Sequence, residues 1–278
     1  MTAMDKRTKP CGWTLVSLRP QGQHGAVADA LADPCAFMIA LSPWRLQRRL
    51  ADPALRQLQQ ALQASRVIFT SPAAVVAASG ALPLQDAPPR PWLAVGEGTL
   101  RALRAVGIHH ALAPQRMDSE GLLALPALAA VRGQTVGLVT APGGRGLIAA
   151  QLQERGAQLV RADVYQRVPL RVPPRGLARL SRSPQPWVLA VSSGEALERV
   201  WAQLTPDWQA RWQARMDVVV ASERLRVQVQ GLGFAHVVVA DGPTPQQMAA
   251  ACRQLAHRAM PGGTMADGAV AEGAMPDG

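Results

Sequence analysis

Short runs of consecutive apolar residues recur along the chain, and longer segments with helical spacing separate them. Strands that are apolar throughout, without alternating polar residues, are typical of a parallel sheet that is buried on both faces. Alternation of strands and helices then predicts the α/β class, with right-handed crossovers. The expected strands are Trp13–Leu18, Phe37–Leu41, Arg66–Phe69, Trp92–Val95, Thr135–Val139, Leu159–Val164, Trp187–Val191, Asp217–Ala221 and His236–Ala240. The clearest expected helices are Leu46–Gln63, Gly98–Val106, Gly121–Ala130, Gly144–Arg155, Glu195–Gln203, Glu223–Gly231 and Pro245–Arg258.

The chain has 278 residues, which is one large domain or two of ordinary size. Two segments, Val67–Val75 and Leu189–Leu197, both read as a strand, two small or hydroxyl residues and a helix start. This internal similarity favours two α/β halves, although the turn and cap residues common to α/β proteins in general would also explain it. Two proline-flanked stretches, near Pro43 and over Gln166–Pro174, are expected to be crossings, where the chain passes from one half to the other. They indicate that one half is inserted into the other.

We therefore expect two doubly wound parallel-sheet domains with the active cleft between them. Domain 1 is discontinuous and takes residues 1–40 and 168–260, whereas domain 2 is inserted and takes residues 43–163. The tail 261–278 has no hydrophobic periodicity, so we expect it to be disordered.

The formal net charge is +10, and only Lys6 and Lys9 of the 29 basic residues are lysines. Arginine binds carboxylates and phosphates well, which favours an anionic partner, although a GC-rich genome would explain the same composition. The arginines are scattered and aromatic residues make up 4% of the chain, so we expect no nucleic-acid partner.

The number of cysteines and the length of the apolar runs limit which cellular compartment and which kinds of site we expect. Three cysteines without CxxC or Cys/His spacing argue against a disulfide framework and a structural zinc site. The apolar runs are far shorter than the ~20 residues that a membrane span requires. We expect a cytoplasmic protein without a membrane partner, and five dispersed histidines predict no bound metal.

Small and hydroxyl residues follow several of the expected strands, at the edge where ligands bind open α/β sheets. Such residues can donate hydrogen bonds to an anion, but each serine or threonine there can also be a helix N-cap. Arg145 stands at an expected helix start, which the helix dipole disfavours and a ligand role would explain. The strand-end positions are Thr70-Ser71, Gly96–Thr99, Ala141–Arg145, Ser192-Ser193 and Ser222.

Tyr165 is the only tyrosine of the chain and is expected at the end of a strand, near the second crossing. Its phenol can donate a hydrogen bond at neutral pH, because the ordinary pKa of tyrosine is about 10. A half-buried core aromatic is the alternative interpretation.

Taken in order, several segments resemble the uroporphyrinogen-III synthase family, and together they span roughly residues 13–258. The short segment Leu31–Phe37 and both chain ends depart from the family pattern. The matching segments are Leu15–Pro20, Val67–Val75, Val95–Leu103, Asp118–Leu122, Gly143–Leu152, Val164–Arg167, Val191–Ala196, Val220–Leu225 and Gly242–Met248.

The resemblance implies two α/β domains joined by a two-stranded linker, and a cofactor-free carbon–oxygen lyase of heme biosynthesis. Such an enzyme dehydrates and cyclises linear hydroxymethylbilane to uroporphyrinogen III, inverting ring D through a spirocyclic intermediate. The substrate carries eight carboxylates, which suits a basic, donor-rich site that orients it. We expect a monomer, because no exposed amphipathic repeat demands a partner, and hydroxymethylbilane synthase, which makes the substrate, is a candidate partner.

By the same resemblance, Tyr165 and Thr99 are the candidate catalytic residues. Tyr165 would hydrogen-bond the leaving hydroxyl group. The candidate substrate-binding residues are Arg19, Ser71, Gly96, Arg145, Arg167, Ser193 and Ser222. The alternative function is a non-catalytic two-domain α/β binding protein for a small polyanionic ligand.

Overall fold

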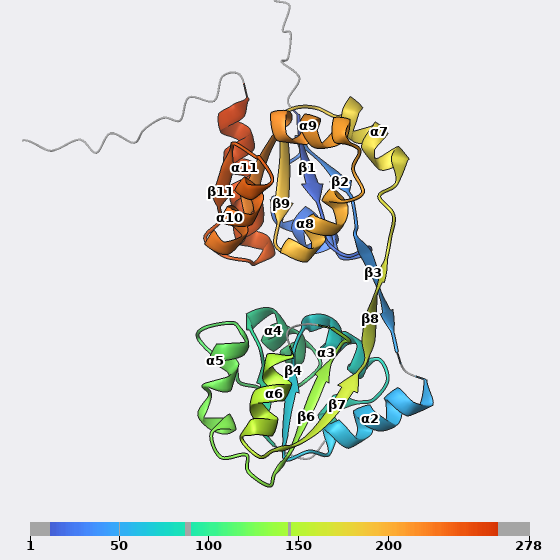
Figure 1. The fold of residues 1–278 in the computed structure, drawn as a ribbon, viewed down its shortest axis with the longest axis vertical. Helices are drawn as coiled ribbons and strands as arrows, with labels where there is room; N and C mark the ends of the chain where they lie inside the picture. Colours follow the sequence, from blue (N-terminus) through green and yellow to red (C-terminus); the bar gives the residue numbers. More distant parts are fainter. Residues whose placement is uncertain (1–11, 50, 87–89, 144–145, 261–278) are drawn as a thin grey trace, which may run out of the picture. The chain divides into compact units, whose positions relative to one another are not determined.

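The computed structural model describes residues 12–49, 51–86, 90–143 and 146–260, and the chain divides into two compact units (Figure 1). Unit 1 is Met1–Pro43 with Leu170–Gly278, and unit 2 is Trp44–Pro169. We expected the inserted domain over 43–163, whereas unit 2 extends to Pro169 because its last strand pairs with its first. The predicted disordered tail 261–278 lies outside the described residues.

Unit 1 contains a five-stranded parallel sheet in the order β11-β10-β9-β1-β2. Trp13 and Leu15 of β1 pack in one buried cluster with Val27 of α1 and Cys252 of α11. The strands are β1 (Trp13–Ser17), β2 (Ala36–Ala40), β9 (Trp187–Val191), β10 (Met216–Val220) and β11 (Val237–Val239). The helices are α1 (Gly25–Leu31), α7 (Pro174–Arg182), α8 (Gly194–Trp201), α9 (Pro206–Arg215), α10 (Glu223–Gly231) and α11 (Pro245–Ala259).

Unit 2 contains a four-stranded parallel sheet in the order β5-β4-β6-β7 and a separate antiparallel ribbon of β3 with β8. The strands are β3 (Trp44–Arg48), β4 (Arg66–Phe69), β5 (Trp92–Ala94), β6 (Thr135–Thr140), β7 (Gln158–Asp163) and β8 (Tyr165–Pro169). The helices are α2 (Asp52–Leu62), α3 (Pro72–Ser79), α4 (Glu97–Ala105), α5 (Ser119–Leu123) and α6 (Leu147–Glu154), with 3₁₀ turns η1 (Leu84–Asp86) and η2 (Pro126–Leu128).

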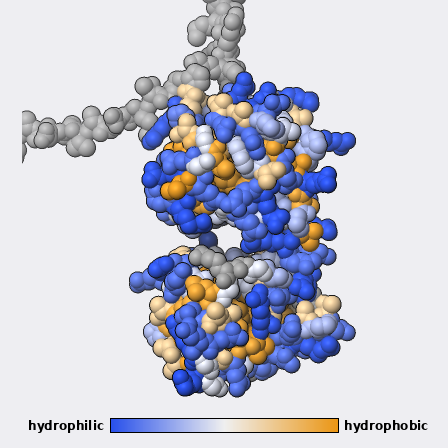
Figure 2. All heavy atoms as spheres, viewed as in Figure 1, coloured by the Kyte–Doolittle hydropathy of each residue, from blue (hydrophilic) through white to orange (hydrophobic). Residues whose placement is uncertain are grey.

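Both faces of the unit 2 sheet are buried. Val67 and Phe69 of β4 belong to one hydrophobic cluster, whereas Ile68 between them belongs to the cluster on the opposite face. Successive side chains of a strand point to opposite faces, so an apolar residue is required at every position. The predicted α/β class with parallel sheets is confirmed. The surface seen in Figure 2 is largely hydrophilic, with smaller hydrophobic patches.

Some predicted elements are wrong in detail. The helix expected over Leu46–Gln63 is a strand, β3, followed by α2, which begins only at Asp52. β3 exists because it pairs with β8 more than a hundred residues later, with Leu46 opposite Arg167. Tyr165 does not end a strand: β7 ends at Asp163, and Tyr165 begins β8.

The cysteines of unit 1 differ in chemistry. Cys35 is disulfide-bonded, so the argument against disulfides is wrong for this residue. Cys252 is a free thiol without solvent exposure, and burial raises its pKa to about 12.

We therefore expect iodoacetamide to leave Cys252 unmodified in the native protein at pH 8, because the thiolate is the reactive form. Peptide mass spectrometry should detect the modified cysteine only after unfolding in guanidinium chloride. Rapid labelling of the native protein would contradict this expectation.

Candidate functional site

A cavity of about 220 Å³ lies at the carboxyl ends of the strands of unit 2. Ligands of open α/β sheets bind at this edge. The volume lies below the 300–1,000 Å³ typical of pockets that enclose a drug-sized ligand, so the cavity fits one part of a larger molecule. Its polar lining residues are Thr70, Ser71, Ser119, Thr140, Arg161, Tyr165 and Arg167.

Tyr165 and Ser71 join two elements at this cavity. Tyr165 is 6% exposed, and its hydroxyl lies 3.1 Å from the Oγ of Ser71. Ser71 is also the N-cap of α3, and its Oγ accepts the backbone N–H of Ala74 at 3.1 Å. The cap therefore fixes the serine that holds the phenol, and the phenol oxygen has a defined position at the cavity.

Hydroxyl groups also connect the neighbouring strand ends. The Oγ1 atoms of Thr70, after β4, and Thr140, at the end of β6, are 2.8 Å apart. Each hydroxyl has one hydrogen and can accept further bonds, so the pair keeps capacity to bind a ligand.

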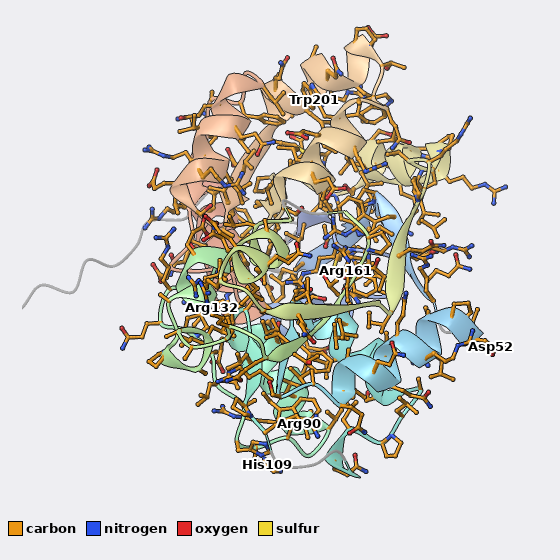
Figure 3. All side chains as sticks on the ribbon, turned by 60° about the horizontal axis from the view of Figure 1, so that its bottom comes forward. Asp52, Arg90, His109, Arg132, Arg161 and Trp201 are labelled. Carbon is orange, nitrogen blue, oxygen red and sulfur yellow. The ribbon has the colours of Figure 1, made fainter. Side chains whose placement is uncertain are left out.

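Arg161 on β7 is a lining residue that the sequence analysis missed (Figure 3). Its Nε donates to Asp163 Oδ1 at 3.0 Å, and its Nη2 donates to the carbonyl oxygen of Ala141 at 3.0 Å. The guanidinium is thus held by two contacts while its side chain stays partly exposed. The sequence does not show how β7 pairs with its neighbours, so it gave no sign that this arginine faces a cavity.

Arg167 also lines the cavity, and its guanidinium stacks over the Trp44 ring at 4.9 Å from the centroid. Two arginines and no carboxylate occur in the described lining. This charge distribution favours an anionic ligand group such as a carboxylate.

Two other unit 2 candidates do not line this cavity. Thr99 lies in α4 at 4% exposure, and Gly96 is the N-cap residue of that helix; neither lines the cavity. Arg145 lies outside the described residues. Arg19, Ser193 and Ser222 belong to unit 1, and the predicted cleft between the domains stays a prediction.

The serines of unit 1 differ in their local role. Ser193 is the N-cap of α8, and its Oγ accepts the N–H of Ala196 at 3.3 Å. Ser222 occupies the N-cap position of α10 without a side-chain capping bond.

Two further features bear on the kind of site. Over the described part of the chain, no group of three or more His, Cys, Asp or Glu side chains is placed to hold a metal ion. Among the helices of these same residues, none is long and apolar enough to span a membrane.

Fold and cavity together define a class: a two-unit α/β protein with a strand-end cavity lined by arginines and hydroxyls. Residues 36–250 match the family HEM4, described as Uroporphyrinogen-III synthase HemD. The chain is 33% identical over 250 residues to the uroporphyrinogen-III synthase of Escherichia coli (strain K12), covering 87% of this chain and 95% of that protein.

Solved structures show the same fold. A mutant uroporphyrinogen III synthase from the extremely thermophilic bacterium Thermus thermophilus aligns with 17% identity and a TM-score of 0.55, covering 87% of this chain and 98% of that one. Uroporphyrinogen-III synthetase from Helicobacter pylori 26695 aligns with 14% identity and a TM-score of 0.55, covering 87% and 99%.

The chain belongs to the uroporphyrinogen-III synthase family, which confirms the predicted resemblance. Its function is that of a uroporphyrinogen-III synthase in porphyrin biosynthesis, and its substrate is a small-molecule tetrapyrrole.

Proposed function

We propose that this chain is a carbon–oxygen lyase that closes linear hydroxymethylbilane to uroporphyrinogen III and water, and that Tyr165 acts in the unit 2 cavity. One observation carries the assignment of the site. The tyrosine hydroxyl, held by Ser71, lies in a cavity whose charged lining residues are arginines.

In the first step, the Tyr165 hydroxyl hydrogen-bonds the leaving hydroxyl of the substrate. The C–O bond breaks, the pyrrole nitrogen supplies the electrons, and water leaves with the proton that the acid donates. The cationic azafulvene that remains is attacked by ring D at its substituted carbon, which gives the spirocyclic intermediate. Cleavage of the older bond between ring D and its bridge carbon leaves a second azafulvene, and the free carbon of ring D attacks it, which inverts the ring. The proton that this carbon then loses restores the pyrrole and returns to Tyr165.

Orientation decides the isomer. Direct closure without inversion also occurs in solution, so the enzyme must favour attack by the substituted carbon. Arg161 and Arg167, with the hydroxyls of Thr70 and Thr140, can hold carboxylates of one part of the substrate beside Tyr165. The remaining predicted contacts, and the monomeric state and transfer from hydroxymethylbilane synthase, stay proposals.

The isomer assay tests this function. Purified protein is mixed with hydroxymethylbilane, and the products are oxidised and separated as type I and type III isomers. We expect mainly type III at a rate far above the spontaneous one. Only type I product at the spontaneous rate would favour the alternative, a non-catalytic binding protein.

Arg161→Gln is expected to raise the KM for hydroxymethylbilane about tenfold, because a charge-assisted hydrogen bond to a carboxylate is lost. Arg132→Gln is the matched control: Arg132 is an exposed arginine of the same unit that lies apart from Arg161 (Figure 3). The measurement is steady-state kinetics of type III formation. Equal KM values for the two variants would remove Arg161 from substrate binding.

A further inference from the structure

A groove of about 730 Å³ lies in unit 1 between β2 and α7, and it shares no lining residue with the cavity of unit 2. β2 is the last strand of its sheet, and among the described strands it pairs with β1 only, so its outer edge is unpaired (Figure 1). Phe37 of β2 lines the groove, and its side chain is 51% exposed. An unpaired strand edge beside an exposed aromatic ring favours contact with a further protein segment.

The helix side of the groove is basic. Arg175, Arg179 and Arg182 of α7 line it, and their spacing of four and three residues places them on one face of the helix. Within the described ranges no carboxylate lines the groove, and none of these arginines forms a hydrogen bond or an ion pair. Arg179 and Arg182 suit the negative end of the helix dipole, but Arg175 lies in the first turn, where a cation is unfavourable. The three charges therefore favour an acidic occupant.

Residues 261–278 of the same chain have the complementary charge. They carry Asp267, Glu272 and Asp277 and no lysine or arginine. Each acid belongs to a repeat of five residues, with Met or Val two positions before the acid and glycine directly after it. Residues two apart in an extended chain point to the same side, so each repeat can present an apolar and an acidic side chain together. The groove offers the matching pair, an exposed phenylalanine beside arginines.

The segment 261–278 starts close to the strand that lines the groove. The last turn of α11 contacts the loop before β2: His257 Nε2 lies 3.2 Å from Asp33 Oδ2, and Asp33 Oδ1 accepts the N–H of Cys35. Met260, the last described residue of unit 1, packs against the same cluster as residues of β2. A segment of this length spans up to about 60 Å when extended, and a small domain is about 30 Å across. The segment can therefore reach the groove.

We propose that residues 261–278 dock in the groove between β2 and α7 of the same molecule, with their acids on the arginines of α7 and their apolar side chains against Phe37. The docked segment covers the open edge of the sheet, which is otherwise available for edge-to-edge association. Exposed ion pairs are individually weak, but a tethered segment has an effective concentration in the millimolar range. A contact with a dissociation constant of about 1 mM is then occupied about half of the time.

Paramagnetic broadening in the full-length chain tests the docking. A nitroxide is attached through Ala269→Cys, and the wild type treated with the same reagent is the blank, because its free Cys252 is buried. We expect the amide signals of Phe37 and Met38 to lose about half of their intensity. The signal of Val238, in β11 at the opposite edge of the sheet, should not change. High salt should restore the lost intensity, because it screens exposed charges.

Charge variants separate this docking from non-specific contact. Asp267→Asn, Glu272→Gln and Asp277→Asn together should abolish the broadening, and they change no residue of the described helices and strands. Arg179→Gln should weaken the broadening several-fold. Arg224→Gln is the matched control, because it removes an exposed arginine from α10 of the same unit, and it should leave the broadening unchanged.

Three results would overturn the proposal. Broadening that survives the three neutral substitutions, or that is equal at Val238 and Phe37, would show non-specific contact. No broadening at Phe37 and Met38 would leave the groove to an acidic segment of another protein. The third result comes from a mixture of nitroxide-labelled chain with unlabelled ¹⁵N chain, in which broadening would show that the segment docks on a second copy.

Discussion

Replacing Tyr165 with phenylalanine is expected to lower the rate of uroporphyrinogen III formation about a hundredfold, the lower end of what general acid catalysis contributes. Spontaneous closure without inversion continues, so the product shifts towards the type I isomer. The fold should persist, because the variant loses one hydrogen bond, to Ser71, worth about 1 kcal/mol. Single-turnover rates and isomer ratios measure the effect.

Ser181→Ala is the matched control for loss of one hydroxyl group. Ser181 is exposed in α7, and its Oγ donates to the carbonyl oxygen of Ala178. We expect wild-type kinetics in this variant. A wild-type rate and isomer ratio in Tyr165→Phe itself would show that the phenol is not the acid and that the tyrosine is a core aromatic only.

Gly137→Ala is expected to have the largest effect on stability. Gly137 lies in β6 between buried residues, and a Cβ there would stand 2.1 Å from the carbonyl oxygen of Ala61 in α2. The obstacle is backbone, so α2 would have to move away from the sheet. We expect a loss of about 3 kcal/mol in the free energy of unfolding, measured by urea denaturation.

Gly25→Ala is the control for this substitution, because no atom lies within 4 Å of a Cβ at Gly25. Its free energy of unfolding should stay within about 0.5 kcal/mol of the wild type. The same small change in Gly137→Ala would contradict the close contact between β6 and α2.

The parallel sheets could be predicted from sequence because burial on both faces leaves a local signal. Val67, Ile68 and Phe69 are all apolar because each has a covered face to occupy. β3 left no such signal. Its residues are mostly exposed, and it becomes a strand only through its pairing with β8, which a local pattern does not contain.

The candidate site was predicted in part for a related reason. Ser71 was predicted from its place after a strand and Arg167 from the family resemblance, and both line the cavity. Arg161 was missed because its place at the cavity depends on a contact to Ala141, which lies distant in sequence. Thr99 has the expected helix position but is buried away from the cavity lining.

The most direct test of the central claim is a crystal structure of the protein with a bilane that carries a methyl group in place of the reactive hydroxymethyl group. We predict that this methyl carbon lies beside the Tyr165 hydroxyl and that a carboxylate of the same molecule contacts Arg161 or Arg167. An analogue bound with its reactive end away from the unit 2 cavity would contradict the account.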